Sequence, residues 1–395
     1  MGGIETLRQD NSFSFSKHLK SMEKLIVSSL SKSYSLQPIQ LDEKNLFVLA
    51  MSQEVASTIA WNRAQYGGWE NISVPWQKAF DETDKRISAY LVELDRVGAC
   101  FASTGIPLVA LKNSGIVRGI YPFPGAVPMG DVDVLVRKQD FRRAHAILLE
   151  NGYQFEFRSA LEEEDIEEAE QGGGAEYWKV LPNGEKLWFE LQWRPIAGRW
   201  IRPDQEPSAD ELMARSIPIE GTDVRLLAPE DNLLQVCLHT AKHSYVRAPG
   251  LRLHLDVERI VRAYPGLDWS LFMQRVEKLQ VKTATYFSLV IPKELFGTPI
   301  PDDVLNRLRP AVRKEKTITR LINKAGLFNP HEKKFTRFEY ILFNVLLYDD
   351  ARGLWRGVFP EKAWMKERYA IQHGWQLPYF HLKRLGGLLF RRLAT

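Results

Sequence analysis

The stretch Met129-Gly-Asp-Val-Asp-Val-Leu-Val136 is the most informative part of the 395-residue chain. Its alternation of acidic and apolar side chains is typical of a β-strand, in which residues two positions apart point to the same face. Asp131 and Asp133 are therefore predicted to project together, while the valines next to them face a core. Two carboxylates so close repel each other unless a cation lies between them, and oxygen-only ligands suit magnesium or manganese. A solvated strand start beside a turn is the simpler alternative.

A second predicted strand, Lys186 to Trp193, supplies a third acid. Its odd-numbered positions from 187 are apolar or aromatic, so Glu190 lies on the opposite face together with Trp188 and Gln192. An acid inside such a strand costs stability unless something compensates it, and a metal ion shared with the two aspartates would do so. The alternative is an ordinary acid on a half-exposed strand.

Directly upstream of the acidic stretch, Leu108 to Leu111 is a short apolar run of the buried-strand type. It is followed by the small-residue turn Lys112-Asn-Ser-Gly115 and a predicted helix. Backbone amides in such a turn, with the Ser114 hydroxyl and the Lys112 ammonium, can hold a polyphosphate. Arg118, one helical turn further, would add positive charge, although an exposed helix arginine is the simpler interpretation.

The pattern of apolar and polar residues along the sequence predicts three parts and an α+β fold. Residues 1–100 are predicted to form an N-terminal helical region, residues 101–228 a small mixed β-sheet with helices packed on it, and residues 229–395 a C-terminal helical domain. The strands therefore all fall in the central part.

Local signals predict individual elements. Helices are expected at Asp84 to Thr104 and at Asp140 to Asn151, and Pro182-Asn-Gly-Glu185 predicts a hairpin turn. Glu162 to Gly174 lacks apolar periodicity and is interpreted as a charged excursion followed by a flexible loop, or in part as a helix. Further helices are predicted from Pro229 onward, and then at Leu251 to Ala263, Leu271 to Leu279, Lys282 to Ile291, Val304 to Leu308 and Glu339 to Leu347.

Composition excludes several classes of protein. With 45% hydrophobic and 26% charged residues, the chain is an ordinary globular sequence, and its net charge of +4 is too small to imply nucleic-acid binding by itself. Cys100 and Cys237 have no second thiol at metal-ligand spacing, which argues against a disulfide framework. Residues 1–37 lack the pattern of a secretory signal, and nowhere do about 18 uncharged apolar residues form a transmembrane segment. A cytoplasmic location is therefore expected.

Two features downstream allow several interpretations. His239 and His243 are four residues apart on one predicted helix face, a spacing also used for zinc, but no Glu follows His239 as the metalloprotease motif requires. A phosphate or substrate contact and a packing role are the alternatives. Arg252 and Asp256 most simply form an i, i+4 surface pair. The tail, His381 to Ala394, interleaves basic and apolar residues, which is compatible with a docked terminal helix or with contact to an anionic membrane surface.

Leu111-Lys-Asn-Ser114, followed by Tyr121 and then by Met129 to Val136, resembles an uncharacterised nucleotidyltransferase family of the polymerase-β superfamily. Members of that family carry a Lys-Gly turn ahead of an Asp-Ile-Asp-Leu-Leu-Val strand. The segments Asp231 to His243 and Leu251 to Asp256 resemble the same family's helical domain. The likeness thus covers roughly residues 106–262.

The resemblance implies a metal-dependent nucleotidyltransferase core in which Asp131, Asp133 and Glu190 are the ligands of Mg²⁺ or Mn²⁺. It also implies that Lys112 and Ser114 belong to a triphosphate-binding turn. The other candidate site residues are Asn113, Arg118 and Gly130 for the nucleotide, and His239, Lys242, His243 and Arg252 for the substrate or its phosphate; in the family, Arg252 and Asp256 line the cleft.

The expected reaction is transfer of a nucleoside monophosphate from a nucleoside triphosphate, expected to be ATP, to an acceptor hydroxyl or phosphate with release of pyrophosphate. A peptide, a sugar or an RNA all stay open as acceptor. Asn113 stands where the family usually has glycine, and Val127 where a basic residue often precedes the acidic strand, so altered nucleotide use is compatible with the sequence. The alternatives are phosphoryl transfer to a peptide or small molecule at the same site, and a non-catalytic binding module. The kinase glycine loop and the G-x-x-x-x-G-K-[ST] loop are both absent.

Overall fold

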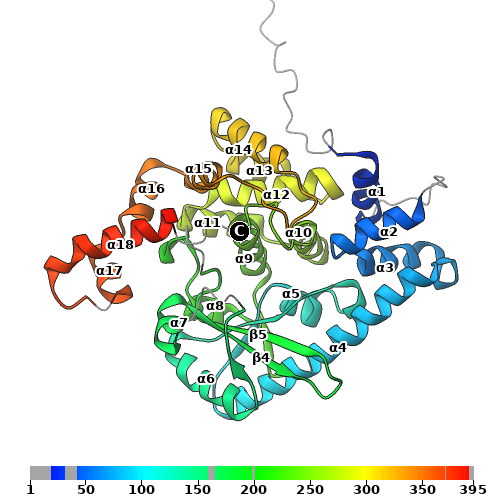
Figure 1. Ribbon diagram of the computed structural model, residues 1–395, viewed down its shortest axis with the longest axis horizontal. Coiled ribbons are helices and arrows are strands. Elements are labelled where there is room, and N and C mark those ends of the chain that lie inside the picture. The colour runs from blue at the N-terminus through cyan, green and yellow to red at the C-terminus, as the bar shows by residue number, and fades with distance from the viewer. Residues whose placement is uncertain (1–18, 32–41, 159–164, 198–200, 370, 391–395) are drawn as a thin grey trace, which may run out of the picture.

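The computed structural model describes residues 19–31, 42–158, 165–197, 201–369 and 371–390. In this part of the chain a seven-stranded mixed sheet is surrounded by helices, which confirms the predicted α+β class (Figure 1). The expectation that the N-terminus carries no secretory signal rests mostly on residues 1–18, and the end of the basic tail is at 391–394. Both lie outside the described residues. The predicted limits of the three parts, at residues 100 and 228, remain predictions.

The sheet is built around strand β2, which is flanked by β5 on one side and β1 on the other. The pairing of β2 with β5 is parallel and that of β2 with β1 is antiparallel, and the full order is β3-β4-β5-β2-β1-β7-β6. The strands are β1 (Leu108–Ala110), β2 (Val132–Leu135), β3 (Gln154–Phe155), β4 (Gly174–Val180), β5 (Lys186–Gln192), β6 (Ile217–Pro218) and β7 (Val224–Leu226).

Strand β2 is buried on both faces, which explains its run of apolar residues. Val132 and Val134 belong to the main hydrophobic core, whereas Leu135 joins Val109 in a smaller cluster against helix α8 (Ala209–Arg215). Alternation along the strand places Asp133 on the same face as Leu135. Asp133 is thus a buried acid on the face of β2 where Leu135 packs against aliphatic groups.

The predicted hairpin is confirmed, with β4 and β5 paired antiparallel along their whole length. The Leu181 N–H donates to the Glu185 carbonyl at 2.8 Å, and Gly184 takes the positive φ of 86° that closes the turn. The turn residues thus predict where β4 ends and β5 begins, whereas β4 starts at Gly174, a few residues before the predicted Tyr177.

The predicted flexible loop before β4 is wrong for residues 166–172, and the alternative of a partial helix is confirmed. Helix α7 (Ile166–Gly172) begins where the Asp165 carboxylate accepts a hydrogen bond from the Glu168 N–H at 2.8 Å. It ends at Gly173, whose φ of 108° is a left-handed C-cap, and β4 follows at once. Capping, rather than apolar periodicity, defines this helix.

The N-terminal helices are α1 (Ser21–Leu30), α2 (Glu43–Ser52), α3 (Ala56–Gly67) and α4 (Val74–Ser103). They form the right-hand part of Figure 1, from which α4 runs along the strand layer. The helix predicted from Asp84 is only the last two thirds of α4. Because Pro75 occupies the first turn and Trp76 is fully buried, the helix begins about ten residues earlier.

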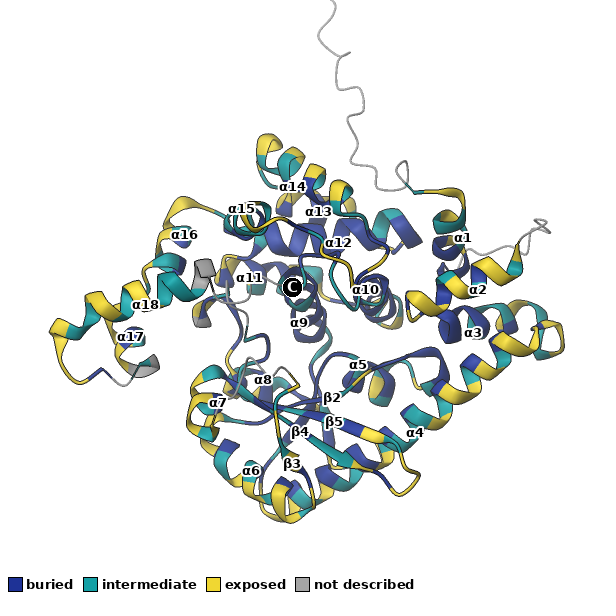
Figure 2. Cartoon of the chain, in the orientation of Figure 1, coloured by how far each residue is buried: buried dark blue, intermediate teal, exposed yellow. Residues whose placement is uncertain are grey.

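The C-terminal helices pack around α9, which is buried along most of its length (Figure 2). Helix α9 contacts α10, α11 and α12 and also reaches α5 (Lys112–Gly115) at the sheet. The predicted helices from Pro229 onward are confirmed, most of them with ends shifted by a few residues. The helices from here to the C-terminus are α9 (Pro229–Lys242), α10 (Leu251–Ala263), α11 (Trp269–Leu279), α12 (Lys282–Phe296), α13 (Asp302–Leu308), α14 (Val312–Ala325), α15 (Arg337–Leu347), α16 (Ala351–Val358), α17 (Lys362–Arg368) and α18 (Leu377–Phe390).

The tail begins as helix α18 and is fixed to the neighbouring helices. The Arg384 guanidinium donates to the carbonyl of Gly357, in α16, at 2.7 Å. This contact supports the docked-helix interpretation of the described part of the tail. In the residues that the structure describes, we find no helix with the length and hydropathy needed to cross a membrane.

Candidate active site

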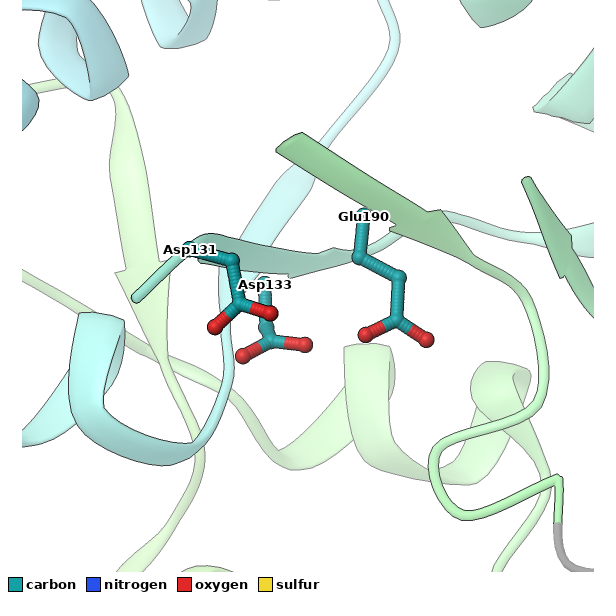
Figure 3. A group of neighbouring side chains, drawn as sticks. All are labelled: Asp131, Asp133 and Glu190. Carbon is teal, nitrogen blue, oxygen red and sulfur yellow. The ribbon is translucent and has the colours of Figure 1, made fainter. Parts of the chain in front are cut away.

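Three carboxylates converge at the centre of the sheet. Asp131 directly precedes β2, Asp133 lies within it, and Glu190 is the residue of β5 that pairs with Asp133 in the parallel ladder. Figure 3 shows that the three carboxylates point to the same side of the two strands. One potential ligand atom from each lies within 4.8 Å of the others. The spatial convergence predicted from the two strands is therefore confirmed.

Burial separates the three acids. Asp133 is only 3% exposed, which contradicts the alternative of a solvated strand start, whereas Asp131 and Glu190 are half-buried. At Gly130 no atom lies within 4 Å of the place where a Cβ would stand, so space is open beside Asp131. The site formed by the three acids is thus buried from solvent at Asp133 and has open space beside Asp131.

Each carboxylate has a basic partner. The Lys112 ammonium lies 2.6 Å from Asp133 Oδ1 and 3.3 Å from Glu190 Oε2, and its side chain is 8% exposed. The guanidinium of Arg158 lies 2.6 Å from Asp131 Oδ2. The sequence placed Lys112 near the acids but assigned it to phosphate, and it gave no signal for Arg158, which lies in a loop far along the chain.

The amide of Gln192 is a further partner, because its Nε2 donates to Asp133 Oδ1 at 3.1 Å. Gln192 is buried and lies on the same face of β5 as Glu190, two residues away. The alternation of β5 therefore contained the signal for this contact. Asp133 is consequently held by an ammonium and an amide at the same oxygen.

The charges of the site shift its pKa values in opposite directions. Burial raises the pKa of Asp133, as do the nearby Asp131 and Glu190 carboxylates, and Lys112 only partly offsets this. At Glu190 burial also opposes ionisation, but the Lys112 ammonium and a hydrogen bond with Asp133 lower the pKa below its usual range. Burial works against the charge of Lys112 as well, yet Asp133 and Glu190 raise its pKa, so the ammonium stays protonated.

The turn after β1 is joined directly to the acidic strand. The Ser114 hydroxyl, fully buried, accepts a hydrogen bond from the Asp133 N–H at 2.9 Å. Lys112 adopts a φ of +50°, an uncommon conformation for a residue with a side chain. The buried Oδ1 of Asn113 has no hydrogen-bond partner among the described residues. A Cβ at Gly115 would lie 2.8 Å from the Ala110 carbonyl, so the turn requires a glycine there.

Helix α9 and its C-cap residue carry His239, Lys242 and His243, which the sequence predicts to contact the substrate or its phosphate. The Lys242 ammonium donates to the Ile196 carbonyl at 2.9 Å, and the rings of His239 and His243 meet edge to face with centroids 4.7 Å apart. Burial lowers the pKa of His243 to about 3, with Lys242 and Lys112 adding to the effect, and it also lowers the pKa values of His239 and Lys242. Both histidines are therefore neutral at neutral pH. In the described part of the chain, only the acidic triad brings three potential metal ligands together, so zinc at the histidine pair gains no support.

The predicted surface pair of Arg252 and Asp256 is wrong. Asp256 is buried and pairs with Arg259 at 3.4 Å, whereas Arg252 pairs at 2.7 Å with Glu54, in the turn between α2 and α3. The long-range partner Glu54 replaces the local one because α10 packs inside the molecule and not on its surface.

Two arginines of α10 hold the loop that leads into the acidic strand. Arg252 donates to the Pro128 carbonyl at 3.2 Å, and Arg259 donates to the Ala126 carbonyl at 2.8 Å. Arg118 lies elsewhere, since its guanidinium pairs with Asp95 of α4 at 2.9 Å. No ion pair among the described residues joins Arg118 or Arg252 to the triad.

Comparison with known proteins gives one finding. A family model described as an uncharacterised nucleotidyltransferase matches residues 40–297, which is more than half of the chain. The matched segment contains the triad, the turn after β1 and helices α9 and α10. No curated protein and no solved structure is significantly similar to the chain.

Proposed function

Because the chain belongs to this uncharacterised nucleotidyltransferase family, we propose that it transfers a nucleoside monophosphate from a nucleoside triphosphate to an acceptor hydroxyl or phosphate. The observation that carries the proposal is the meeting of Asp131, Asp133 and Glu190 within 4.8 Å, beside the turn that follows β1. Pyrophosphate is the expected second product, and ATP the expected nucleotide. A peptide, a sugar and an RNA remain open as acceptors.

The donor set fits a divalent cation. Three carboxylates from adjacent strands offer only oxygen atoms, which is the chemistry that Mg²⁺ and Mn²⁺ prefer. In our proposal Asp131, Asp133 and Glu190 hold the metal. When bound there, it would neutralise charge on the phosphate oxygens and stabilise the charge that develops during displacement.

The turn after β1 is proposed to hold the triphosphate. Lys112 supplies the positive charge, and the backbone amides around Asn113 supply hydrogen-bond donors. Ser114 is proposed to act mainly by fixing this turn to β2, because its hydroxyl is buried against the Asp133 N–H. Gly130 leaves space for the nucleotide beside Asp131.

Glu190 is proposed to receive the proton of the acceptor hydroxyl. Its pKa is lowered by Lys112 despite burial, so loss of the Lys112 contact would make the carboxylate more basic. His239, Lys242 and His243 are proposed to contact the substrate from α9. Arg118 and Arg252 are left out of the proposed site because each is paired with a carboxylate outside the triad.

The test is release of pyrophosphate from each nucleoside triphosphate in the presence of Mg²⁺ and candidate acceptors. Wild-type activity that is lost in Asp133→Asn is the expected result, and activity unchanged in Asp133→Asn would discard the mechanism. Mass spectrometry of the product separates the two transfer reactions, since the adduct is either a nucleotide or a single phosphate.

A binding assay addresses the non-catalytic alternative. A nucleotide present at 100 times its Kd stabilises the folded state by about 2.7 kcal/mol, so thermal unfolding with Mg²⁺ and nucleotide detects binding without turnover. If no nucleotide stabilises the protein, the result favours a non-catalytic binding module whose turn no longer accepts nucleotide.

A further inference from the structure

Each of the three acids of the triad is already paired with one of the chain's own cations. Lys112 lies 2.6 Å from Asp133 and 3.3 Å from Glu190, and Arg158 lies 2.6 Å from Asp131. Three negative charges thus face two positive ones that come from the turn after β1 and from the loop after β3. Every carboxylate that would bind a metal is engaged in an ion pair.

A divalent cation at the triad competes with these ion pairs. Lys112 contacts the same Asp133 oxygen that also accepts from Gln192, so this oxygen has little capacity left for a metal. A monovalent and a divalent cation about 4 Å apart in a poorly solvated site also repel each other strongly. A metal that binds all three carboxylates therefore competes with Lys112 for Asp133 and Glu190, and it binds most tightly once Lys112 has left them.

The Lys112 ammonium can move away from the carboxylates. Its ammonium sits on a flexible four-carbon stem, whereas the carboxylates it contacts belong to paired strands. Its φ of +50° also shows that the backbone is held in an uncommon conformation. Arg158 is less enclosed, with 38% of its side chain exposed, and it has Glu176 as a second partner at 3.3 Å.

We propose that Lys112 and Arg158 act as internal counter-cations that make binding of the metal depend on binding of the nucleotide. A triphosphate at the turn offers both cations new anionic partners, so they leave the carboxylates as the nucleotide enters. The metal then takes their place among the acids. This inference rests on the proposed function, because it assigns the triphosphate to the turn that carries Lys112.

The consequence is positive thermodynamic coupling between the two ligands. Metal alone binds weakly because it competes with Lys112 for the acids, and nucleotide alone binds weakly because drawing Lys112 away leaves the acids without a counter-ion. Coupling is reciprocal, so each ligand tightens the other by the same factor, and a typical factor is between about 5 and 150.

The experiment is titration with Mn²⁺, followed by electron paramagnetic resonance, with and without a non-hydrolysable triphosphate. Chelation by the free nucleotide is measured separately and subtracted. In the wild type, the nucleotide should tighten Mn²⁺ binding by about tenfold or more. In Lys112→Met, Mn²⁺ alone should bind about tenfold more tightly than in the wild type, and the nucleotide should add little.

Lys186→Met is the matched control. Lys186 lies on β5, the strand of Glu190, and contacts the rings of Trp178 and Trp188, so its removal deletes the same charge nearby without touching the triad. Its Mn²⁺ affinity and its coupling should equal those of the wild type. Arg158→Gln is a second variant, in which Mn²⁺ alone should also bind more tightly.

The proposal is overturned if Lys112→Met binds Mn²⁺ no more tightly than the wild type while its thermal unfolding shows a folded protein. Equal tightening in Lys186→Met also overturns it, because the effect would then be one of net charge. Since Mn²⁺ binding is read without turnover, these outcomes are distinct from a failure to release pyrophosphate, which would remove the proposed reaction alone.

Discussion

The hydroxyl of Ser114 accepts a hydrogen bond from the backbone N–H of Asp133 at 2.9 Å, inside the protein. This contact joins the proposed phosphate-binding turn to the strand that carries the acids. A shift of the turn would therefore also shift the strand. The distance between the turn and the acids is thus fixed by this hydrogen bond as well as by the pairing of the strands.

Replacement of Ser114 by alanine should destabilise the protein. The buried N–H of Asp133 would lose its partner, and an unsatisfied buried donor costs about 1–3 kcal/mol. Urea unfolding of Ser114→Ala measures the loss. Ser103→Ala is the control, because the Ser103 hydroxyl bonds the Cys100 carbonyl at an exposed site, and it should change the free energy of unfolding little. Equal effects of the two replacements would contradict a special role for the Ser114 contact.

Replacement of Glu190 by glutamine should lower nucleotide transfer by about 10²–10³-fold, since it removes one charge from the site where charge develops. Pyrophosphate release at saturating Mg²⁺ measures the effect. Glu185→Gln is the control, because Glu185 lies in the turn that leads into β5 and is not part of the triad. A loss in Glu185→Gln as large as that in Glu190→Gln would contradict the assignment.

Replacement of Arg259 by methionine should cost about 3–5 kcal/mol of stability, because it leaves the Asp256 carboxylate buried without its partner. Chemical denaturation measures this cost. The double variant Arg259→Met with Asp256→Asn should recover part of it, since no uncompensated charge remains. If the double variant is as unstable as Arg259→Met, the cost comes from the lost hydrogen bond to Ala126 and not from the stranded charge.

His254 should make the protein less stable in mild acid. Burial lowers its pKa to about 4 from an ordinary 6.5, and its Nε2 donates to the Tyr245 carbonyl. Below pH 6.5 the unfolded chain therefore binds a proton that the folded one excludes, and stability falls as the pH decreases toward 4. The difference corresponds to about 3 kcal/mol at pH 4, and the contribution is constant above pH 6.5.

Urea unfolding between pH 7 and pH 4.5 tests this dependence. The variant His254→Gln should lose less stability over that range than the wild type, while groups common to both chains cancel in the comparison. Parallel curves for the two proteins would show that His254 does not titrate in this way.

The parts of the site that could be predicted share one property: they follow from local spacing. Alternation along β2 and β5 placed Asp131, Asp133 and Glu190 on matching faces, and the turn at 182–185 fixed where β5 begins. The positions of α9 to α13 and of α15 followed from apolar periodicity, whereas α14, α16 and α17 were not predicted. These signals lie within a few residues of the feature they predict.

The parts that could not be predicted depend on partners that are distant in sequence. Arg158 reaches Asp131 across 27 positions, and Arg252 pairs with Glu54 from the N-terminal helices. No spacing rule relates such residues, because folding alone brings them together. The local rule for Arg252 and Asp256 gave the wrong partner since it assumed an exposed helix face.

The parallel pairing of Asp133 with Glu190 also determines which changes in length the chain tolerates. The polypeptide leaves β2, forms α6 (Phe141–Glu150), β3, α7 and β4, and returns at the start of β5. Insertions in the connections of this excursion leave the spacing of the acids intact, because loop length has a small energetic cost. One residue inserted within β5 ahead of Glu190 turns its carboxylate to the opposite face. Related chains can thus differ in the length of the loops around the active site while the three carboxylates keep their relative positions.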